Sequence, residues 1–249
     1  MIPARTADPL VPLLGLPGVA DAVSRARAAL VGVHNHPVNR RGWPATAAEA
    51  GLRAARASAA LDGAPLTSDD EVRDPVLDGA VRAAEELGRL LPVWRTAPLQ
   101  VLARLHVLAA AGLVPAGEQQ AVLGRPRPNQ AVAARLGLLA DLITGGTAVA
   151  APVLVAVVHG ELLALEPFDT ANGVVARAAA RLAAVATGLD PKGLAVPEVG
   201  HLRHASEYRQ AAAGFATGKP DAIATWLRHC CAQWEIGARE GRSIADARG

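Results

Sequence analysis

Residues 153–177 read VLVAVVHGELLALEPFDTANGVVAR, and this stretch decides the fold. Its first half is a strongly apolar segment typical of a buried helix, and an Ala- and Val-rich helix resumes at Asn172. Between them, residues 166–173 contain a proline, a glycine and short polar side chains, which interrupt helices. The longest apolar run, residues 147–158, is too short to span a bilayer. The stretch therefore predicts two buried helices joined by a short polar loop.

The composition of the whole chain favours an all-α protein. Hydrophobic residues make up 51% of the 249 residues but aromatic residues only 3%, so the core has to be built from Ala, Leu and Val. Ala, Leu and Arg favour helices, whereas strands prefer β-branched and aromatic residues. The net charge is +2 and the basic residues are scattered, so no nucleic-acid-binding surface is expected.

Local signals set the expected helix boundaries. Thr46 and Glu49 form a capping-box pattern, which predicts that a helix begins at Thr46 and ends near Leu61. Pro92 is expected to end a helix that begins near Asp74. Residues 114–129 contain three prolines and two glycines, which predicts a long loop or an irregular hairpin. Further helices are predicted over residues 19–31, 98–111, 130–143, 150–165, 172–187, 204–216 and 221–239.

The cysteines and histidines give no sign of a metal centre. Cys230 and Cys231 are adjacent on a predicted helix and point in different directions, so they are expected to be buried apolar side chains without a mutual disulfide. His106 and His159 lie on apolar helices and are expected in the core. The other histidines are expected in a loop without acidic partners (His34 and His36) or at the surface (His201 and His204).

Three features resemble motifs of the Fic family, whose members mostly transfer AMP from ATP to a protein hydroxyl. Residues 153–177 are similar to the family's buried helix and its motif H-P-F-x-D/E-G-N-G-R-x-x-R, aligned on residues 167–168 and 172–173. Residues 102–113, LARLHVLAAAGL, are similar to the helix before the family's substrate-binding flap. Residues 58–63, SAALDG, resemble its inhibitory motif S/T-x-x-x-E-G/N. The resemblance covers about residues 46–237.

The resemblance implies a Fic-type helical bundle core with an N-terminal helical segment and a flap loop or hairpin. It divides the chain into an N-terminal extension (1–45), N-terminal helices with the inhibitory-like motif (46–95) and a Fic-like core (96–240). Several prolines and Asp8 disfavour a signal peptide in the N-terminal stretch, so a cytoplasmic protein without a membrane segment is expected.

The catalytic positions of the motif depart from the family pattern. Glu166 stands where the family has its proton-accepting His, and a carboxylate of ordinary pKa is a weaker base. We weigh a replacement catalytic base against a solvated or capping carboxylate, and favour the second because strongly perturbed acids are exceptional. Thr170 replaces the acidic residue that would hold Mg²⁺, and a shift of Asp169 into that role would change the direction of its side chain. No metal site is therefore expected.

The phosphate-binding positions are partly kept. Ala171 and Val174 replace a Gly and an Arg that approach phosphate, but Asn172 and Gly173 still begin a helix, and Arg177 is retained. The resemblance leaves ATP or another nucleotide as the candidate ligand of these residues. Ser58, Asp62 and Gly63 match the inhibitory motif, which implies an ion pair between Asp62 and Arg177. Flap residues Arg125 and Arg127 are either solvated or flank a peptide or phosphate, and we weigh the two equally.

Three functions are compatible with this pattern. The first is a Fic-like protein inactive in AMP transfer, whose cleft has a structural, regulatory or weak nucleotide-binding role toward an unknown protein partner. The second is an enzyme of altered chemistry, which transfers nucleotidyl or phosphoryl groups or hydrolyses a substrate with Glu166. It requires an open, electropositive cleft and a Glu166 withdrawn from solvent. The third is a homo-oligomeric assembly module, such as a homodimer. We favour the first.

Overall fold

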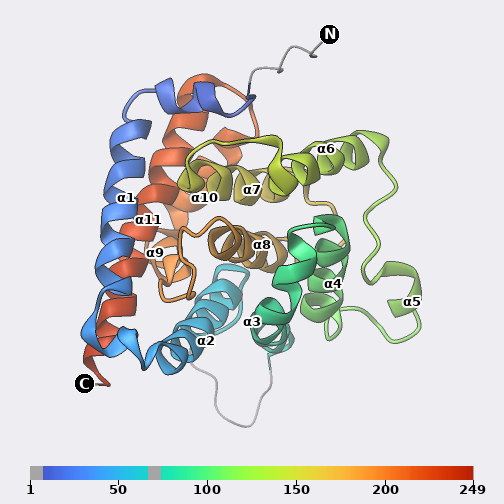
Figure 1. The fold of residues 1–249 in the computed structure, drawn as a ribbon. Coiled ribbons are helices and arrows are strands. Elements are labelled where there is room, and N and C mark those ends of the chain that lie inside the picture. The colour runs from blue at the N-terminus through green and yellow to red at the C-terminus, as the bar shows by residue number, and fades with distance from the viewer. Residues whose placement is uncertain (1–7, 67–73, 249) are drawn as a thin grey trace.

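The computed structural model describes residues 8–66 and 74–248 and is built from helices alone over these ranges (Figure 1). No described helix is long and apolar enough to cross a membrane. The eleven α-helices of the described residues are α1 (Val19–His34), α2 (Trp43–Leu61), α3 (Pro75–Trp94), α4 (Pro98–Ala110), α5 (Gln119–Val122), α6 (Gln130–Asp141), α7 (Ala151–Leu165), α8 (Asn172–Ala186), α9 (Pro197–Arg203), α10 (Ala205–Phe215) and α11 (Pro220–Asp246). Two short 3₁₀-helices occupy Val11–Gly15 and Pro37–Arg40, and a π-helical turn occupies Leu142–Gly146.

Helix α8 lies at the centre of the molecule (Figure 1). Every residue from Val174 to Ala184 is buried, and the helix packs against α7, α3, α4 and α2. Because aromatic residues are few, the side chains between these helices are mainly small, and small side chains let the helices approach closely. Residues 152–160 of α7 are likewise all buried. The two predicted buried helices on either side of the 166–173 loop are therefore confirmed, and this loop is fixed between rigid elements.

Helices α1 and α11 come from opposite ends of the chain and lie side by side along one edge (Figure 1). Cys230 and Cys231 of α11 are buried and free, as expected. The main hydrophobic core extends from Leu10 to Ala238 and contains residues of nearly every helix, and a smaller cluster consists of Ala50, Ala54, Val196 and Ile244. The core thus ties the N-terminal helix to the helices that surround α8.

Several predicted boundaries were wrong. Helix α2 begins at Trp43 with Pro44 in its first turn, so Thr46 is a buried residue inside the helix and not its N-cap. Glu49 pairs with Arg53 at 2.7 Å. Helix α3 continues past Pro92 to Trp94, because a proline this close to the helix end removes little of the hydrogen-bond ladder. Helix α11 runs on to Asp246.

Residues 114–129 match one of the two expected forms, whereas one short helix was not expected. Residues 114–129 form the predicted long connection, but among the described residues it contains only the short helix α5 and no strand, so it is a loop and not a hairpin. Helix α9 was not predicted. It has seven residues with Gly200 among them, which gives no helical period to recognise.

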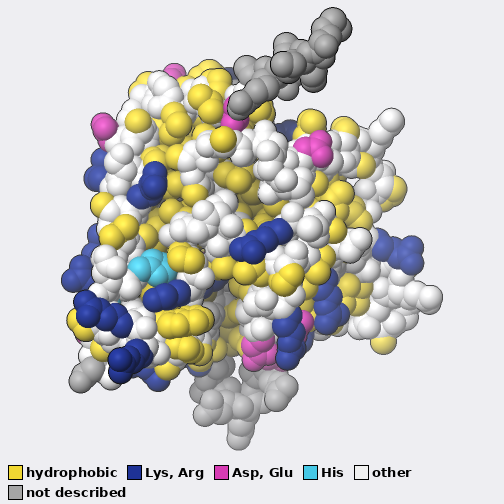
Figure 2. Space-filling view, in the orientation of Figure 1, with side chains coloured by type: hydrophobic (Ala, Val, Ile, Leu, Met, Phe, Trp, Pro, Cys, Tyr) yellow, Lys and Arg dark blue, Asp and Glu magenta, His cyan; other side chains and the backbone are white. Residues whose placement is uncertain are grey.

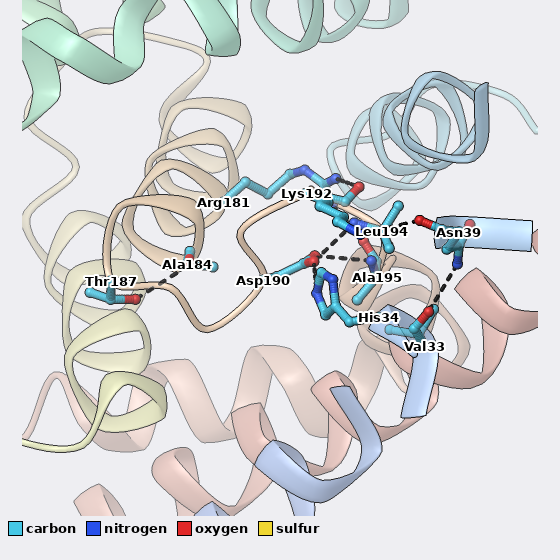
Figure 3. A network of polar contacts seen from close by, with 11 residues as sticks. Val33, His34, Asn39, Arg181, Ala184, Thr187, Asp190, Lys192, Leu194 and Ala195 are labelled. Carbon is cyan, nitrogen blue, oxygen red and sulfur yellow. Dashed lines mark hydrogen bonds and ion pairs between the residues drawn. The ribbon is translucent and has the colours of Figure 1, made fainter. Parts of the chain in front are cut away.

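A buried polar network holds the segment between α8 and α9 (Figure 3). The Asp190 carboxylate accepts hydrogen bonds from the backbone N–H groups of Leu194 and Ala195, at 3.0 and 2.9 Å. Its Oδ1 also lies 2.8 Å from His34 Nε2, at the end of α1. The expectation that His34 and His36 lack acidic partners was therefore wrong, and His36 Nε2 lies 2.9 Å from Asp246.

Candidate functional site at the start of helix α8

The loop between α7 and α8 is held in a strained conformation by its own side chains. Glu166 and Ala171 are the two described residues other than glycine with a positive φ, at 41° and 57°. The Asn172 side chain brackets the loop, since its Oδ1 accepts from the Phe168 N–H at 2.9 Å and its Nδ2 donates to the Phe168 carbonyl at 2.8 Å. The side chain of Asn172 is thus used within the loop, and only its backbone remains for a ligand.

Phe168 and His106 anchor the loop to α4. The two rings stack with centroids 4.1 Å apart and an interplanar angle of 5°. His106 Nδ1 accepts the Gly124 N–H at 3.0 Å, so in the neutral ring the proton is on Nε2. Burial lowers the pKa of His106, and the Asp169 carboxylate and Thr170 backbone oppose this only partly. The expected core role of His106 is confirmed, and the residue joins the loop to the flap.

The connection 114–129, which contains the predicted flap around residues 117–127, is attached directly to the 166–173 loop. The Arg127 N–H donates to the Pro167 carbonyl at 2.7 Å. The Arg127 guanidinium donates to the carbonyls of Leu165 and Glu166 at the end of α7. This arrangement caps α7 with a cation, which the helix dipole favours. Arg125 is exposed to solvent.

Arg177 is the charged centre of the site. It is 3% exposed and projects from the second turn of α8 toward the C-terminal end of α2. Its guanidinium donates to the Ser58 hydroxyl at 2.8 Å, to the Ser58 carbonyl at 2.9 Å and to the Tyr208 hydroxyl at 3.3 Å. Burial works against the charge, but Tyr208 and Asp62 outweigh it and raise the pKa of Arg177.

Asp62 completes the partners of Arg177. Its Oδ1 lies 2.7 Å from Arg177 Nη2, so the expected ion pair between the end of α2 and α8 is present. The Asp62 side chain remains 26% exposed, whereas that of Arg177 is 3% exposed. The pair therefore lies at the boundary between the core and solvent.

The Asp62 carboxylate also covers the first turn of α8. A Cβ added to Gly173 would overlap both carboxylate oxygens and lie 2.8 Å from Asp62 Cγ. The free N–H groups and the dipole of a helix N-terminus favour a negative charge at this position. Gly173 is thus the residue that lets a carboxylate approach the helix this closely. The Asp62 carboxylate thus lies against the first turn of α8.

The loop between α7 and α8 carries two carboxylates, Glu166 and Asp169. Glu166 and Asp169 are exposed, and Thr170 is half-buried. Among the described residues, no group of three His, Cys, Asp or Glu side chains is arranged to hold a metal ion.

A cluster of neutral aromatic groups lies behind Arg177. The Tyr208 hydroxyl also contacts His159 Nε2 at 2.9 Å, and His201 Nδ1 lies 3.2 Å from His229 Nε2. Burial holds the pKa values of His159 and His201 well below the usual range, and lowers that of His229 to about 4. Burial also raises the pKa of Tyr208 to about 12.

The sequence reasoning missed this cluster. His159 is in the core as expected, but His201 is 4% exposed and not a surface residue. The predicted helix over residues 204–216 included His204 and not His201. In the structure His201 belongs to α9, whereas His204 lies between α9 and α10. Tyr208 carries no local motif, because its role depends on contacts with α7 and α8, far away along the chain.

The comparisons with known proteins bear on this fold. No family model matches the chain, and no curated protein matches it in sequence. Among solved structures, residues 134–508 of Fic-1 from C. elegans superpose with a TM-score of 0.72 at 15% identity, covering 96% of this chain and 76% of that one. The protein has the Fic fold. A Fic family protein from Desulfovibrio desulfuricans G20 superposes with a TM-score of 0.68 at 19% identity, covering 91% of this chain and 74% of that one.

These sequence identities are too low to support a conclusion beyond the Fic fold itself. The likeness confirms the all-α architecture and the expected Fic-type arrangement of helices. The roles of individual residues depend on the geometry described above.

Proposed function

We propose that this Fic-fold protein does not transfer AMP, and that its cleft is a phosphate-type anion site held closed by Asp62. The observation that carries the proposal is the position of the Asp62 carboxylate, which pairs with Arg177 and covers Gly173 at the start of α8. A phosphate group would need these same partners, so it competes with Asp62. The cleft then has a regulatory or structural role, in which an anionic ligand or a protein partner displaces the end of α2.

The absence of suitable catalytic groups supports the first half of the proposal. Glu166 replaces the catalytic His implied by the resemblance, and it is exposed to solvent at the end of α7. An exposed carboxylate is a weak base toward a hydroxyl. Thr170 supplies no carboxylate for a metal. The alternative of an enzyme that uses Glu166 required a residue withdrawn from solvent, and this exposure counts against it.

The contacts of the loop support the second half. Arg127 and the Asn172 side chain are bound within the protein, to the end of α7 and to Phe168. Of the expected anion-binding residues, Arg177 and the backbone at Gly173 are the ones that face Asp62. Movement of Asp62 would therefore uncover Gly173 and release the Nη2 group of Arg177 from its carboxylate, while Arg177 stays bound to Ser58 and Tyr208.

Incubation with ATP labelled on the α-phosphate tests the lack of transfer. The wild-type protein and the Asp62→Ala variant are each incubated with labelled ATP and Mg²⁺, alone and with a cell lysate. We expect no protein-bound label in either case, because opening the site does not restore a base or a metal ligand. Label that appears with Asp62→Ala and is lost again with Asp62→Ala/Glu166→Ala would contradict the proposal and establish Glu166 as a catalytic residue.

A further inference from the structure

A second pocket lies between α2, α3 and the C-terminal half of α8, away from the site at the start of α8. Its volume is about 330 Å³, within the range of small-molecule sites. The walls are mainly apolar and include Trp43, Leu87, Leu91, Leu182 and Val185. Gly173 and Val185 are twelve positions apart on α8, or about 18 Å along the helix axis at 1.5 Å per residue. In the orientation of Figure 2, apolar side chains lie at the surface over the middle of the molecule, among Lys and Arg residues.

Two helix-interior glycines keep this pocket open. Gly51 of α2 and Gly88 of α3 both line it, and a Cβ added at either residue would meet no atom within 4 Å. A glycine inside a helix costs about 1 kcal/mol relative to alanine. Close packing does not require these two glycines, in contrast to Gly79 of α3, where a Cβ would overlap the Ala109 backbone. The lack of side chains at Gly51 and Gly88 therefore leaves empty volume on α2 and α3.

Two cations, Arg181 and Lys192, line the apolar pocket. Arg181 reaches from α8 to the segment that carries Lys192, as Figure 3 shows. The charge of Arg181 is balanced by Glu198, whose Oε2 lies 3.1 Å from Arg181 Nη1. Lys192 is half-buried and donates to the Asn39 carbonyl at 3.1 Å, and it forms no ion pair within the part of the chain that the structure describes. The nearby Asp190 carboxylate is already bound to two backbone N–H groups and His34. One positive charge is therefore left at the pocket.

We propose that this pocket binds a small amphipathic carboxylate, with its apolar chain between α2 and α3 and its carboxylate at Lys192. An apolar chain matches the walls, and a single negative charge matches the one unbalanced cation. The proposal does not depend on the anion site at α8.

Matched ten-carbon probes test the ligand class. Decanoate, decanol and decyltrimethylammonium share a chain and differ in the charge of the head group. Each is titrated into the wild-type protein by calorimetry and followed by tryptophan fluorescence. Trp43 is 38% exposed, whereas the other three tryptophans are 4% exposed or less. A change of tryptophan fluorescence when decanoate binds therefore reports mainly on Trp43. We expect 1:1 binding of decanoate, at least tenfold tighter than either other probe, because a charged hydrogen bond contributes about one factor of ten.

Variants locate the probe. Gly88→Leu and Gly51→Leu fill the pocket and are expected to abolish decanoate binding, with folding checked by circular dichroism. Gly137→Leu, at a glycine of α6 that also has free space around it, is the control and should bind as the wild type does. Lys192→Gln should weaken decanoate about tenfold and leave decanol unchanged. The proposal is overturned if decanoate does not bind, if it binds equally to well-folded Gly88→Leu, or if Lys192→Gln leaves its affinity unchanged.

Discussion

At the scale of single residues, the molecule is organised around one buried cation. Arg177 is held by Ser58, Tyr208 and Asp62, and only Asp62 carries an opposite charge. Removing one partner of a buried ion pair leaves an uncompensated charge, which costs about 3–5 kcal/mol when both partners are fully buried. Because the Asp62 side chain is 26% exposed, water screens part of this interaction.

The Asp62→Ala substitution is therefore expected to lower the free energy of unfolding by about 1–3 kcal/mol. Inorganic phosphate or pyrophosphate should recover part of this loss, since a ligand that binds the folded state stabilises it. Denaturant unfolding with and without phosphate measures both effects. Asp141→Ala, which removes an exposed carboxylate at the end of α6, should change stability by less than about 0.5 kcal/mol. Equal stability of Asp62→Ala and wild type would show that the ion pair contributes nothing.

At the scale of elements, small residues decide how closely the helices pack. Gly79 and Gly88 both lie in the interior of α3, but they face different surroundings. A Cβ at Gly79 would overlap the Ala109 backbone of α4, whereas one at Gly88 would meet no atom within 4 Å. A glycine-to-alanine substitution at each of these two positions thus separates the effect of helix propensity on stability from the effect of packing between helices.

Gly88→Ala is expected to stabilise the protein by about 0.5–1 kcal/mol, because alanine favours the helix. Gly79→Ala is expected to destabilise it by about 1–3 kcal/mol or more, since α3 and α4 would have to separate. Thermal and denaturant unfolding of the two variants measures the difference. A loss of stability in Gly88→Ala would mean that its neighbours are closer than the structure places them.

Some of these elements could be predicted from the sequence, and others could not. The apolar patterns of α7 and α8 and the Pro- and Gly-rich connection between α4 and α6 are local signals, and they led to the correct elements. The contact of Asp62 with Arg177 followed from the resemblance to Fic motifs. Thr46, Pro92 and α9 were misjudged for separate reasons. Helix α2 begins three residues before the capping pattern, Pro92 lies in the last turn of α3, and α9 is too short to show a helical period. His34 found an acidic partner 156 positions away, which no local pattern indicates.

At the scale of the whole molecule, the neutral histidine cluster makes stability dependent on pH. His159, His201 and His229 have pKa values lowered by burial, so the unfolded chain binds protons that the folded chain does not. Stability is then lost as pH falls below the unfolded value of about 6.5, and for His229 the loss continues to about pH 4. Above pH 6.5 these groups have no further effect.

Unfolding in denaturant at pH 7.5, 6.5, 5.5 and 4.5 is therefore expected to show a steady fall in stability below pH 6.5. Each histidine contributes a slope of up to about 1.4 kcal/mol per pH unit. His229→Gln removes one titrating group and should reduce the slope between pH 6 and 4.5. An unchanged slope in this variant would contradict a His229 side chain that is neutral in the folded protein.

The most direct test of the central claim is calorimetric titration of ATP, with and without Mg²⁺, into the wild-type protein, Asp62→Ala and the control Asp141→Ala. We predict that ATP binds at least tenfold more tightly to Asp62→Ala than to the other two, because the variant frees Arg177 and the start of α8. We further predict that Mg²⁺ changes this affinity little, since Thr170 offers no carboxylate. Binding of equal strength to all three proteins, or to none, would contradict an anion site closed by Asp62.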